Sequence, residues 1–521
     1  MKRKSVVLAV LFALSAGVTP ARPAAAADEK QVAKLIKQLK DRKEDKRIEA
    51  SYQLVDMKAE AAVPALIEAL HDTSKEVRYN AAGALWNLGE AARPAVPELI
   101  KRLADDDPSV RVQAAGALNN LDTAAAEWVA AVRTVLRDGD EETRKSARDL
   151  LKRAGNGGIQ AAAHDGQVEV VTGLLDGGIE VDALDKHQRT ALHWAAQADK
   201  PEVAKVLLAK GASTALADED RNQPLHLAAM AGSAEVTRLL LAKKADPNVA
   251  DRREFTPLHL AAGKGAKPVV ELLLAAGANP RAKGPSGASP LHMAAAEGRT
   301  EIVQLFLAKG LDINLPDEKT QGPIFYAAAG GHTELVKLLL DRKAALTAPG
   351  LLGEAAGTPL HDAARGGHVA TMELLLARGV PLNAREFGET AFQVAAGAGQ
   401  VESLRFLLSK GAKVDYTPPQ YGNETALHLA THQGHLAAVK FLIESGANVN
   451  AVDAHFGRTP LHKICDHAGL DGERKDIAVL LLDKGAKIDV KDSTGKTPLA
   501  LALESRNDDA VKLFRERGAK E

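Results

Sequence analysis

Histidine is the residue type that most invites a chemical interpretation of this sequence. The chain of 521 residues holds 16 histidines but a single cysteine, Cys465. His428, His432 and His435 are spaced closely enough to suggest a metal site, since imidazole is a common zinc ligand. Two of these three, however, recur at fixed places in a repeated pattern. We therefore expect no metal site here, and a lone cysteine allows no disulfide framework within the chain.

Other motifs for catalysis or cofactor binding are incomplete. Gly495-Lys496-Thr497 is similar to the end of a phosphate-binding loop, but position 490, which would have to be glycine, is valine. The sequence contains no Gly-x-Ser-x-Gly elbow and no His-Glu-x-x-His motif. Stacked repeats also offer no closed, water-poor cleft that would raise a carboxylate pKa. The sequence thus favours a protein that is not an enzyme and binds no cofactor.

The charge balance argues against a nucleic-acid partner. Lys and Arg number 67 and Asp and Glu number 68, which gives a formal net charge of −1. A nucleic-acid binder usually shows a basic excess or a basic stripe, and neither is evident. Aromatic residues make up 3% of the chain and hydrophobic residues 45%, a balance that suits thin, closely packed helices. The 43 glycines predict frequent helix ends.

The first 27 residues have the pattern of a secretory signal peptide. Lys2, Arg3 and Lys4 form a charged start, residues 6–18 form a short apolar stretch, and residues 25–27 are alanines before a cleavage position. The apolar stretch is too short for a membrane-spanning helix, and no later segment is apolar enough to form one. We expect export to the periplasm or the medium.

Residues 28–155 repeat a two-helix unit. Val77-Arg78 followed by Ala81-Ala82 recurs 33 residues later as Val110-Arg111 followed by Ala114-Ala115. Leu and Val at helical spacing give each helix one apolar stripe, and the alanine pairs let the next helix approach closely. This block resembles the HEAT-like repeats over about four units.

A second pattern fills residues 159–521. Thr256-Pro257-Leu258-His259 recurs in steps of 33 residues or slightly more. Intact or degenerate copies begin at Thr190, Gln223, Thr256, Ser289, Gly322, Thr358, Thr390, Thr425, Thr459 and Thr497. Thr caps a helix, Pro fits its first turn and Leu enters the core between helices. This block resembles the ankyrin repeats, in which the histidine bonds locally to steady its turn. The resemblances imply an all-α solenoid: a HEAT-like superhelix followed by an ankyrin stack with β-turn fingers.

The ankyrin resemblance implies that a partner contacts the finger tips and the first-helix faces, which together line a concave groove. The tip Arg252-Arg253-Glu254-Phe255 places an aromatic ring beside two arginines, which suits an anchor for a partner. The alternative is that Phe255 folds back on Pro257. Further partner-binding candidates on neighbouring tips and first helices are Lys186, Arg189, Asn222, Met230 and Lys264.

The later repeats are less even, and insertions in repeat arrays often lie on the working face. The step from 390 to 425 is 35 residues, with Tyr416 and Tyr421 in the finger, so these two tyrosines form a second candidate patch. The alternative is tolerated drift of a loop. Trp194, Met293 and Tyr326 fall at a position often held by Leu in the family, and we expect them in the core.

These observations favour an exported, non-enzymatic scaffold that binds a protein partner through the ankyrin groove and finger loops. A first alternative is a secreted effector or inhibitor that acts on a protein of another cell. A second is an accessory enzyme with a site at the junction of the two repeat blocks. The sequence does not name the partner.

Overall fold

The computed structural model of the protein describes residues 29–103, 105–120, 158–347, 357–417, 424–466, 469–470 and 472–520. The expected signal peptide, the junction of the two repeat blocks at residues 121–157 and Tyr421 lie outside the described residues. Two compact units make up the chain: Met1–Ala195 with Lys205–Ala212, and Ala196–Ala204 with Ser213–Glu521. In the described ranges, no helix is both long and apolar enough to cross a membrane.

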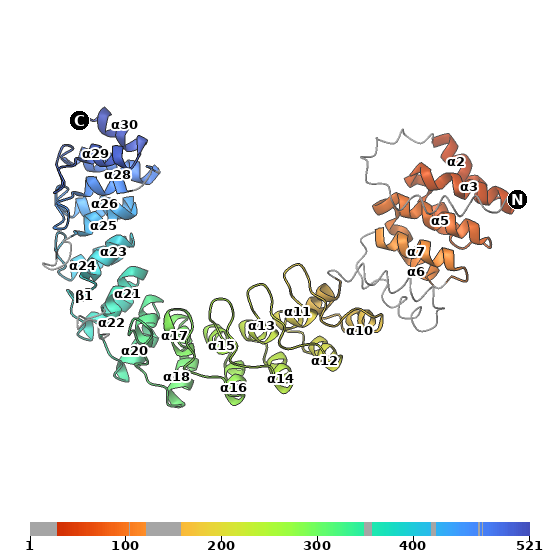
Figure 1. Cartoon of the computed structure of the whole chain (residues 1–521), viewed down its shortest axis with the longest axis horizontal. Helices are drawn as coiled ribbons and strands as arrows, with labels where there is room; N and C mark the ends of the chain where they lie inside the picture. The colour runs from red at the N-terminus through yellow and green to blue at the C-terminus, as the bar shows by residue number, and fades with distance from the viewer. Residues whose placement is uncertain are drawn as a thin grey trace. The chain divides into compact units, whose positions relative to one another are not determined.

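The first unit opens with helix pairs in which Val, Leu and Ala fill the core (Figure 1). Its second helices α3, α5 and α7 pack side by side. The described elements here are α2 (Glu29–Gln38), α3 (Glu44–Met57), η1 (Glu60–Ala62), α4 (Val63–Ala69), α5 (Lys75–Leu88), η2 (Gly89–Ala95), α6 (Val96–Arg102), α7 (Pro108–Asn120) and α10 (Val168–Asp176). The proline expected in the first turn stands there in both α4 and α6.

An arginine on each second helix ties its repeat to the following loop. Arg47 on α3 donates to both carboxylate oxygens of Asp72, at 2.7 and 2.9 Å. Arg78 on α5 does the same with Asp105, at 2.9 and 2.8 Å. Arg78 and Asp105 are both buried, and a buried charge is stable only when it is paired and hydrogen-bonded. The Val-Arg step of the sequence pattern therefore marks a structural ion pair.

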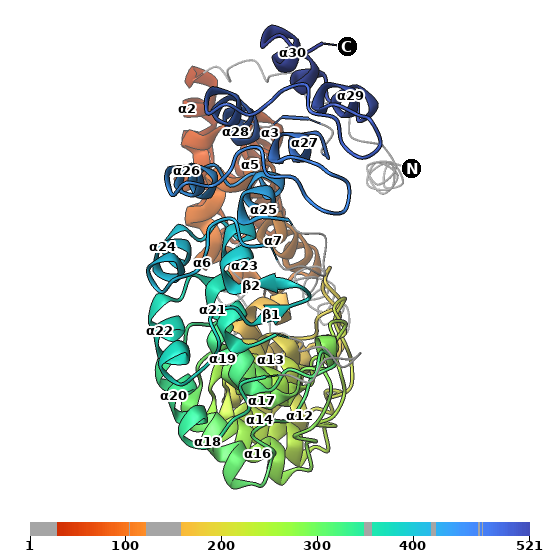
Figure 2. The ribbon, with the colours of Figure 1, turned by 90° about the vertical axis from the view of Figure 1, so that its left-hand side faces the viewer.

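The second unit stacks helix pairs in two rows. First helices from α13 to α27 pack on one another, as do most neighbouring second helices, and Figure 2 shows α20, α22, α24 and α26 along one edge. Bounds up to α20 are α11 (Ala191–Gln197), α12 (Pro201–Ala209), α13 (Pro224–Ala231), α14 (Ala234–Ala242), α15 (Pro257–Lys264), α16 (Lys267–Ala275), η3 (Pro285–Gly287), α17 (Pro290–Ala296), α18 (Thr300–Ala308), α19 (Pro323–Ala329) and α20 (Thr333–Asp341). Of these, α11 and α12 straddle the division between the units.

The remaining elements continue the same two rows. They are α21 (Pro359–Gly366), α22 (Val369–Ala377), α23 (Ala391–Gly397), α24 (Val401–Ser409), α25 (Ala426–Gln433), α26 (Leu436–Glu444), α27 (Pro460–Lys463), η4 (Ile464–Asp466), α28 (Gly472–Asp483), α29 (Pro498–Glu504) and α30 (Asp508–Glu516). The described strands are β1 (Arg385–Glu386) and β2 (Glu389–Thr390), an antiparallel pair two residues long. The predicted fold class, a helical repeat solenoid, is confirmed.

The first helices begin where they do because of the Thr-Pro-Leu-His motif. Before α15, the Thr256 N–H donates to Nδ1 of His259 at 3.1 Å. Nδ1 is thus an acceptor, so Nε2 carries the hydrogen, and Nε2 lies 3.0 Å from the carbonyl oxygen of Ala288 in the next repeat. The histidine therefore caps its own helix and also bonds one repeat to the next. Burial lowers the pKa of His259 to about 4, which keeps its ring neutral.

Gln393 shows that this role is geometric and does not need an imidazole. Its Oε1 accepts the Thr390 N–H at 2.9 Å, and its Nε2 donates to the Glu424 carbonyl at 2.7 Å. Gln393 therefore makes the same two bonds as His259, from the same place in its repeat. The histidines of the motif are framework residues.

Candidate functional site

Each regular finger is held by a buried aspartate. Asp251 precedes the cap of α15 by five positions, and its Oδ1 accepts the N–H groups of Arg253 and Phe255, both at 2.8 Å. Neighbouring fingers are also joined, since the Arg252 N–H donates to the Asp220 carbonyl at 2.8 Å. Aspartates that accept two such N–H groups are Asp185, Asp218, Asp251, Asp317 and Asp492. Internal bonds thus hold the tip backbone, and the tip side chains are left for contacts.

The finger at 251–256 carries the first predicted patch. Arg252 and Arg253 are exposed, whereas Phe255 is half-buried. Its ring centroid lies 5.4 Å from the guanidinium carbon of Arg253 and 5.9 Å from the His259 ring. The ring therefore packs against its own finger and helix and leaves part of its surface open. The structure brings these three candidate residues together on one tip.

The other candidates differ in how much they offer a partner. Met230, 41% exposed, and Lys264 lie on the open faces of α13 and α15. Lys186 is exposed, and Arg189 is half-buried with its guanidinium 5.3 Å from the Trp194 ring centroid. Asn222 stands apart.

Asn222 is only 9% exposed, and its amide donates to Oδ1 of Asp218 at 3.1 Å. Its side chain belongs to the finger framework, because the buried aspartate takes up its amide. Tyr416, from the second predicted patch, is half-buried. Its companion Tyr421 is outside the described residues, so the pair cannot be placed together.

The core position expected for Trp194, Met293 and Tyr326 is wrong, because all three are half-exposed. Trp194 Nε1 donates to Oδ2 of Asp185 at 2.9 Å, and the Tyr326 hydroxyl donates to Oδ2 of Asp317 at 2.8 Å. This position lies four residues after the cap and faces the finger of its own repeat. Its aromatic donors satisfy the second oxygen of the finger aspartate.

Lys463 occupies the same position in a later repeat and was missed by sequence reasoning. Its Nζ pairs with Glu424 and lies 3.3 Å from Oδ2 of Asp453, the finger aspartate of that repeat. Burial alone would lower the pKa of Lys463, but the two carboxylates raise it. The signal that could have found it is the position itself, four residues after Thr459.

Asp362 also occupies this position, but with a different outcome. Arg365 donates to Asp362 at 2.5 Å and to Glu386 at 2.7 Å, while the other oxygen of Asp362 is buried without a hydrogen bond. Burial, reinforced by the nearby Glu386, raises the pKa of Asp362 to about 7. One guanidinium thus bridges two buried carboxylates on the same face of the stack.

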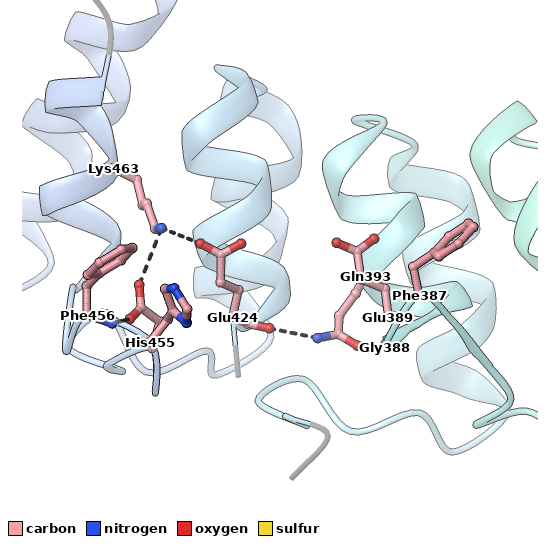
Figure 3. Close-up of a pocket in the computed structure, with 9 residues that line it drawn as sticks. Phe387, Gly388, Glu389, Gln393, Glu424, His455, Phe456 and Lys463 are labelled. Atoms are coloured by element: carbon pink, nitrogen blue, oxygen red, sulfur yellow. Dashed lines mark hydrogen bonds and ion pairs between the residues drawn. The ribbon is translucent and has the colours of Figure 1, made fainter. Parts of the chain in front are cut away.

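A pocket of about 320 Å³ opens beside these residues, between the fingers that precede α23, α25 and α27 (Figure 3). Phe387 and Phe456 lie at its two ends, 74% and 40% exposed, with carboxylates between them. The lining residues, hereafter the finger pocket, are Phe387, Gly388, Glu389, Gln393, Glu424, Asp453, His455, Phe456 and Lys463.

The finger pocket has more negative than positive groups. Lys463 is shared by Glu424 and Asp453, as the dashed lines of Figure 3 show. Within the described part of the chain, no residue hydrogen-bonds to the Glu389 carboxylate or forms an ion pair with it. Burial, followed by the charges of Glu424 and Glu386, raises the pKa of Glu389. The pocket is therefore an acidic recess bounded by two aromatic rings.

The histidines that suggested a metal are committed to the framework. His428 Nε2 donates to the Arg458 carbonyl at 2.9 Å, and His435 Nε2 to the Gly397 carbonyl at 3.0 Å. Across the described ranges, no group of three His, Cys, Asp or Glu side chains could hold a metal ion. The Gly495-Lys496-Thr497 segment is a finger, because Asp492 accepts the Lys496 N–H and Thr497 caps α29.

Comparison with known proteins agrees with this geometry. The family model described as ankyrin repeats (3 copies) matches overlapping stretches, and the model described as HEAT repeats matches residues 32–98. The ankyrin stretches are residues 131–218, 214–284, 258–350, 291–386, 345–418, 360–453 and 427–521.

Among solved structures, the ankyrin repeat domain of human ASB11 is similar to 44% of this chain over 98% of its own length. The two are 28% identical, with a TM-score of 0.37. No curated protein matches the chain. The ankyrin model alone covers well over half of the residues, and the chain therefore belongs to the ankyrin repeat family, with a HEAT-like repeat in its N-terminal part.

Proposed function

We propose that this protein is an exported, non-catalytic scaffold that binds a protein partner through its finger tips and first-helix faces. Ankyrin repeats imply protein partners, and proteins of this family are generally not enzymes. One observation carries the proposal. The motif histidines and finger aspartates are used up in internal bonds, while side chains such as Arg252 and Arg253 stand exposed on a tip held by those bonds.

The binding surface proposed in the second unit centres on Arg252, Arg253 and the open part of Phe255, with Met230 and Lys264 on the adjoining helix faces. An arginine next to an aromatic ring is a frequent hot-spot pair in protein interfaces. Lys186, Arg189, Tyr416 and Tyr421 remain candidates on their own fingers. Asn222 is not among the residues that we propose to contact the partner, because its amide is bound to Asp218.

Export is supported by the sequence pattern of residues 1–27. Cell fractionation followed by N-terminal sequencing tests it directly. We expect the mature protein in the periplasm or the medium, beginning at Asp28. A cytoplasmic protein that still carries residues 1–27 would contradict export and leave the binding proposal in place.

Affinity capture with cross-linking from native periplasm or medium tests the binding. We expect one specific protein, whose affinity falls in Arg252→Ala and Phe255→Ala by roughly 1–2 kcal/mol each, as for interface hot spots. Arg238→Ala is the matched control, since Arg238 is an exposed arginine on second helix α14. Capture of no specific protein, or equal affinity in all three variants, would contradict the proposal.

A further inference from the structure

We infer that the finger pocket binds an arginine side chain presented by an exposed segment of a partner protein. The inference rests on the proposed function only in that the partner is a protein. The pocket is distinct from the Arg252 tip, which is itself basic, so the two surfaces would recognise different chemistry on a partner.

The charges of the pocket call for a cation. Glu389, Glu424 and Asp453 supply three carboxylates, and the single ammonium of Lys463 is shared by two of them. The Glu389 carboxylate has no such partner among the described residues. Beyond it, Arg365 is already bound by Asp362 and Glu386. A ligand cation beside Glu389 would supply the missing counter-charge in a partly desolvated place, where charge pairs are strongest.

The aromatic rings select the kind of cation. Phe387 and Phe456 stand at opposite ends of the row of carboxylates (Figure 3). A guanidinium stacks on aromatic faces and bonds a carboxylate with two parallel N–H groups, whereas an ammonium is a compact, strongly hydrated charge. The protein uses this contact itself, since the Arg458 guanidinium lies 5.0 Å from the Phe456 ring centroid. Arginine therefore fits the pocket better than lysine.

The volume fits a side chain. About 320 Å³ lies at the lower end of the roughly 300–1,000 Å³ that small-molecule sites span. One arginine with the backbone on either side of it would occupy such a recess, and a dinucleotide-sized cofactor would not. The position between three finger tips also suits an extended segment that crosses the fingers.

Phe387 is placed where stability alone would not put it. It sits at the tip of the β1–β2 turn with φ +48, followed by Gly388 with φ +88, and Glu386 pairs with Glu389 across the turn. Turns with two positive φ values favour Asn-Gly, and a bulky residue in the left-handed region costs about 1 kcal/mol or more. An aromatic ring that is 74% exposed at this strained tip is well placed to contact a ligand.

Fluorescence anisotropy with short labelled peptides tests the inference on the full mature chain. The probe is a capped Gly-Ser peptide with two central arginines, and its matched partner carries two citrullines, which keep the shape and lose the charge. We expect the arginine peptide to bind at least roughly ten-fold more tightly, equivalent to about 1.4 kcal/mol, and to weaken as salt is added. A peptide with two lysines should fall between them.

Three variants locate the site. Glu389→Gln and Phe387→Ala should each weaken the arginine peptide roughly ten-fold. Phe387→Asn should weaken it equally while the thermal midpoint stays level or rises, because Asn suits the turn better than Phe. Loss of binding in that variant cannot then be ascribed to misfolding. Tyr52→Ala, an exposed aromatic on α3, and Glu334→Gln, an exposed acid on α20, are matched controls that should bind as the wild type does.

Equal binding of the arginine and citrulline peptides would overturn the inference. So would unchanged arginine binding in both Glu389→Gln and Phe387→Asn. If the pocket fails these tests while Arg252→Ala still weakens a captured protein, the scaffold function stands without this site. If both fail, the proposed function fails as well.

Discussion

At the scale of single residues, the histidines changed their meaning most. The sequence presents 16 of them, and their number invites a metal or acid–base role. In the structure, His226, His259 and His292 each accept a cap N–H on Nδ1 and lie within hydrogen-bond distance of a carbonyl oxygen of the next repeat. Burial lowers the pKa of all three rings. Their chemistry is therefore spent on joining repeats, and it makes the fold sensitive to acid.

His259→Gln tests this role. The ordinary histidine pKa is 6.5 and the folded value for His259 is about 4, so the unfolded chain binds the extra proton first. Stability should be complete above about pH 6.5 and should fall as the pH drops towards 4. Gln393 shows that glutamine makes the same bonds, so the variant should fold and lose part of this acid sensitivity. Thermal midpoints from pH 7.5 to 4.5 measure it, with exposed His187→Gln as the control. An unaltered pH slope would contradict the assignment.

Asp362 has the opposite sign. Its folded pKa of about 7 lies above the ordinary 3.8, so the folded chain holds a proton that the unfolded chain releases. Its contribution to stability is present near pH 4 and is lost as the pH rises through 7. Asp362→Asn should therefore raise the thermal midpoint at pH 8 relative to wild type and change it little at pH 5. Asp341→Asn, at an exposed carboxylate, is the control. A lower midpoint at both pH values would show that the ionised carboxylate is needed.

At the scale of elements, helix starts and fingers could be predicted because their chemistry is local. Thr, Pro and His within four residues define a cap, and the structure places α15, α17 and α21 where the motif predicted them. The finger pocket could not be predicted in this way. Glu424 and Lys463 are 39 positions apart and meet only because the stack sets their fingers side by side. The partial cover of Phe255 was equally invisible, since it depends on ring contacts with Arg253 and His259.

Finger strain gives an element-scale prediction. Thr320 lies at φ +64, two positions before the start of its motif, where other fingers have glycines such as Gly388 and Gly495. A β-branched residue is disfavoured there, while glycine adds entropy to the unfolded chain. Thr320→Gly should therefore stabilise the protein by a net of roughly 0.5 kcal/mol. Gln321→Gly, at the next residue, should destabilise it. Urea unfolding of both variants decides, and a loss of stability in Thr320→Gly would contradict the strain.

At the scale of the whole molecule, stability is shared among neighbours. Bonds such as His226 to Val249 and His259 to Ala288 join each repeat to the one that follows. No disulfide is available, because the only cysteine is Cys465. Stacked repeats of this kind behave as a row of units with nearest-neighbour interfaces.

Deletion of one repeat in register tests this sharing. Removal of residues 256–288 takes out 33 residues and brings equivalent interfaces together, so the variant should keep its helical circular dichroism per residue with a modestly lower midpoint. Removal of residues 256–271 breaks the register and should cost much more helix. Equal damage from the two deletions would show that the repeats are not interchangeable.

Hydrogen–deuterium exchange of the full mature chain, with and without its captured partner, tests the central claim of a finger-tip scaffold most directly. We predict that the partner slows amide exchange in the finger at 251–256 and at the adjoining faces of α13 and α15. The second helices α14 and α16 should exchange as they do in the free protein. Protection confined to those second helices, with the fingers unchanged, would contradict the account.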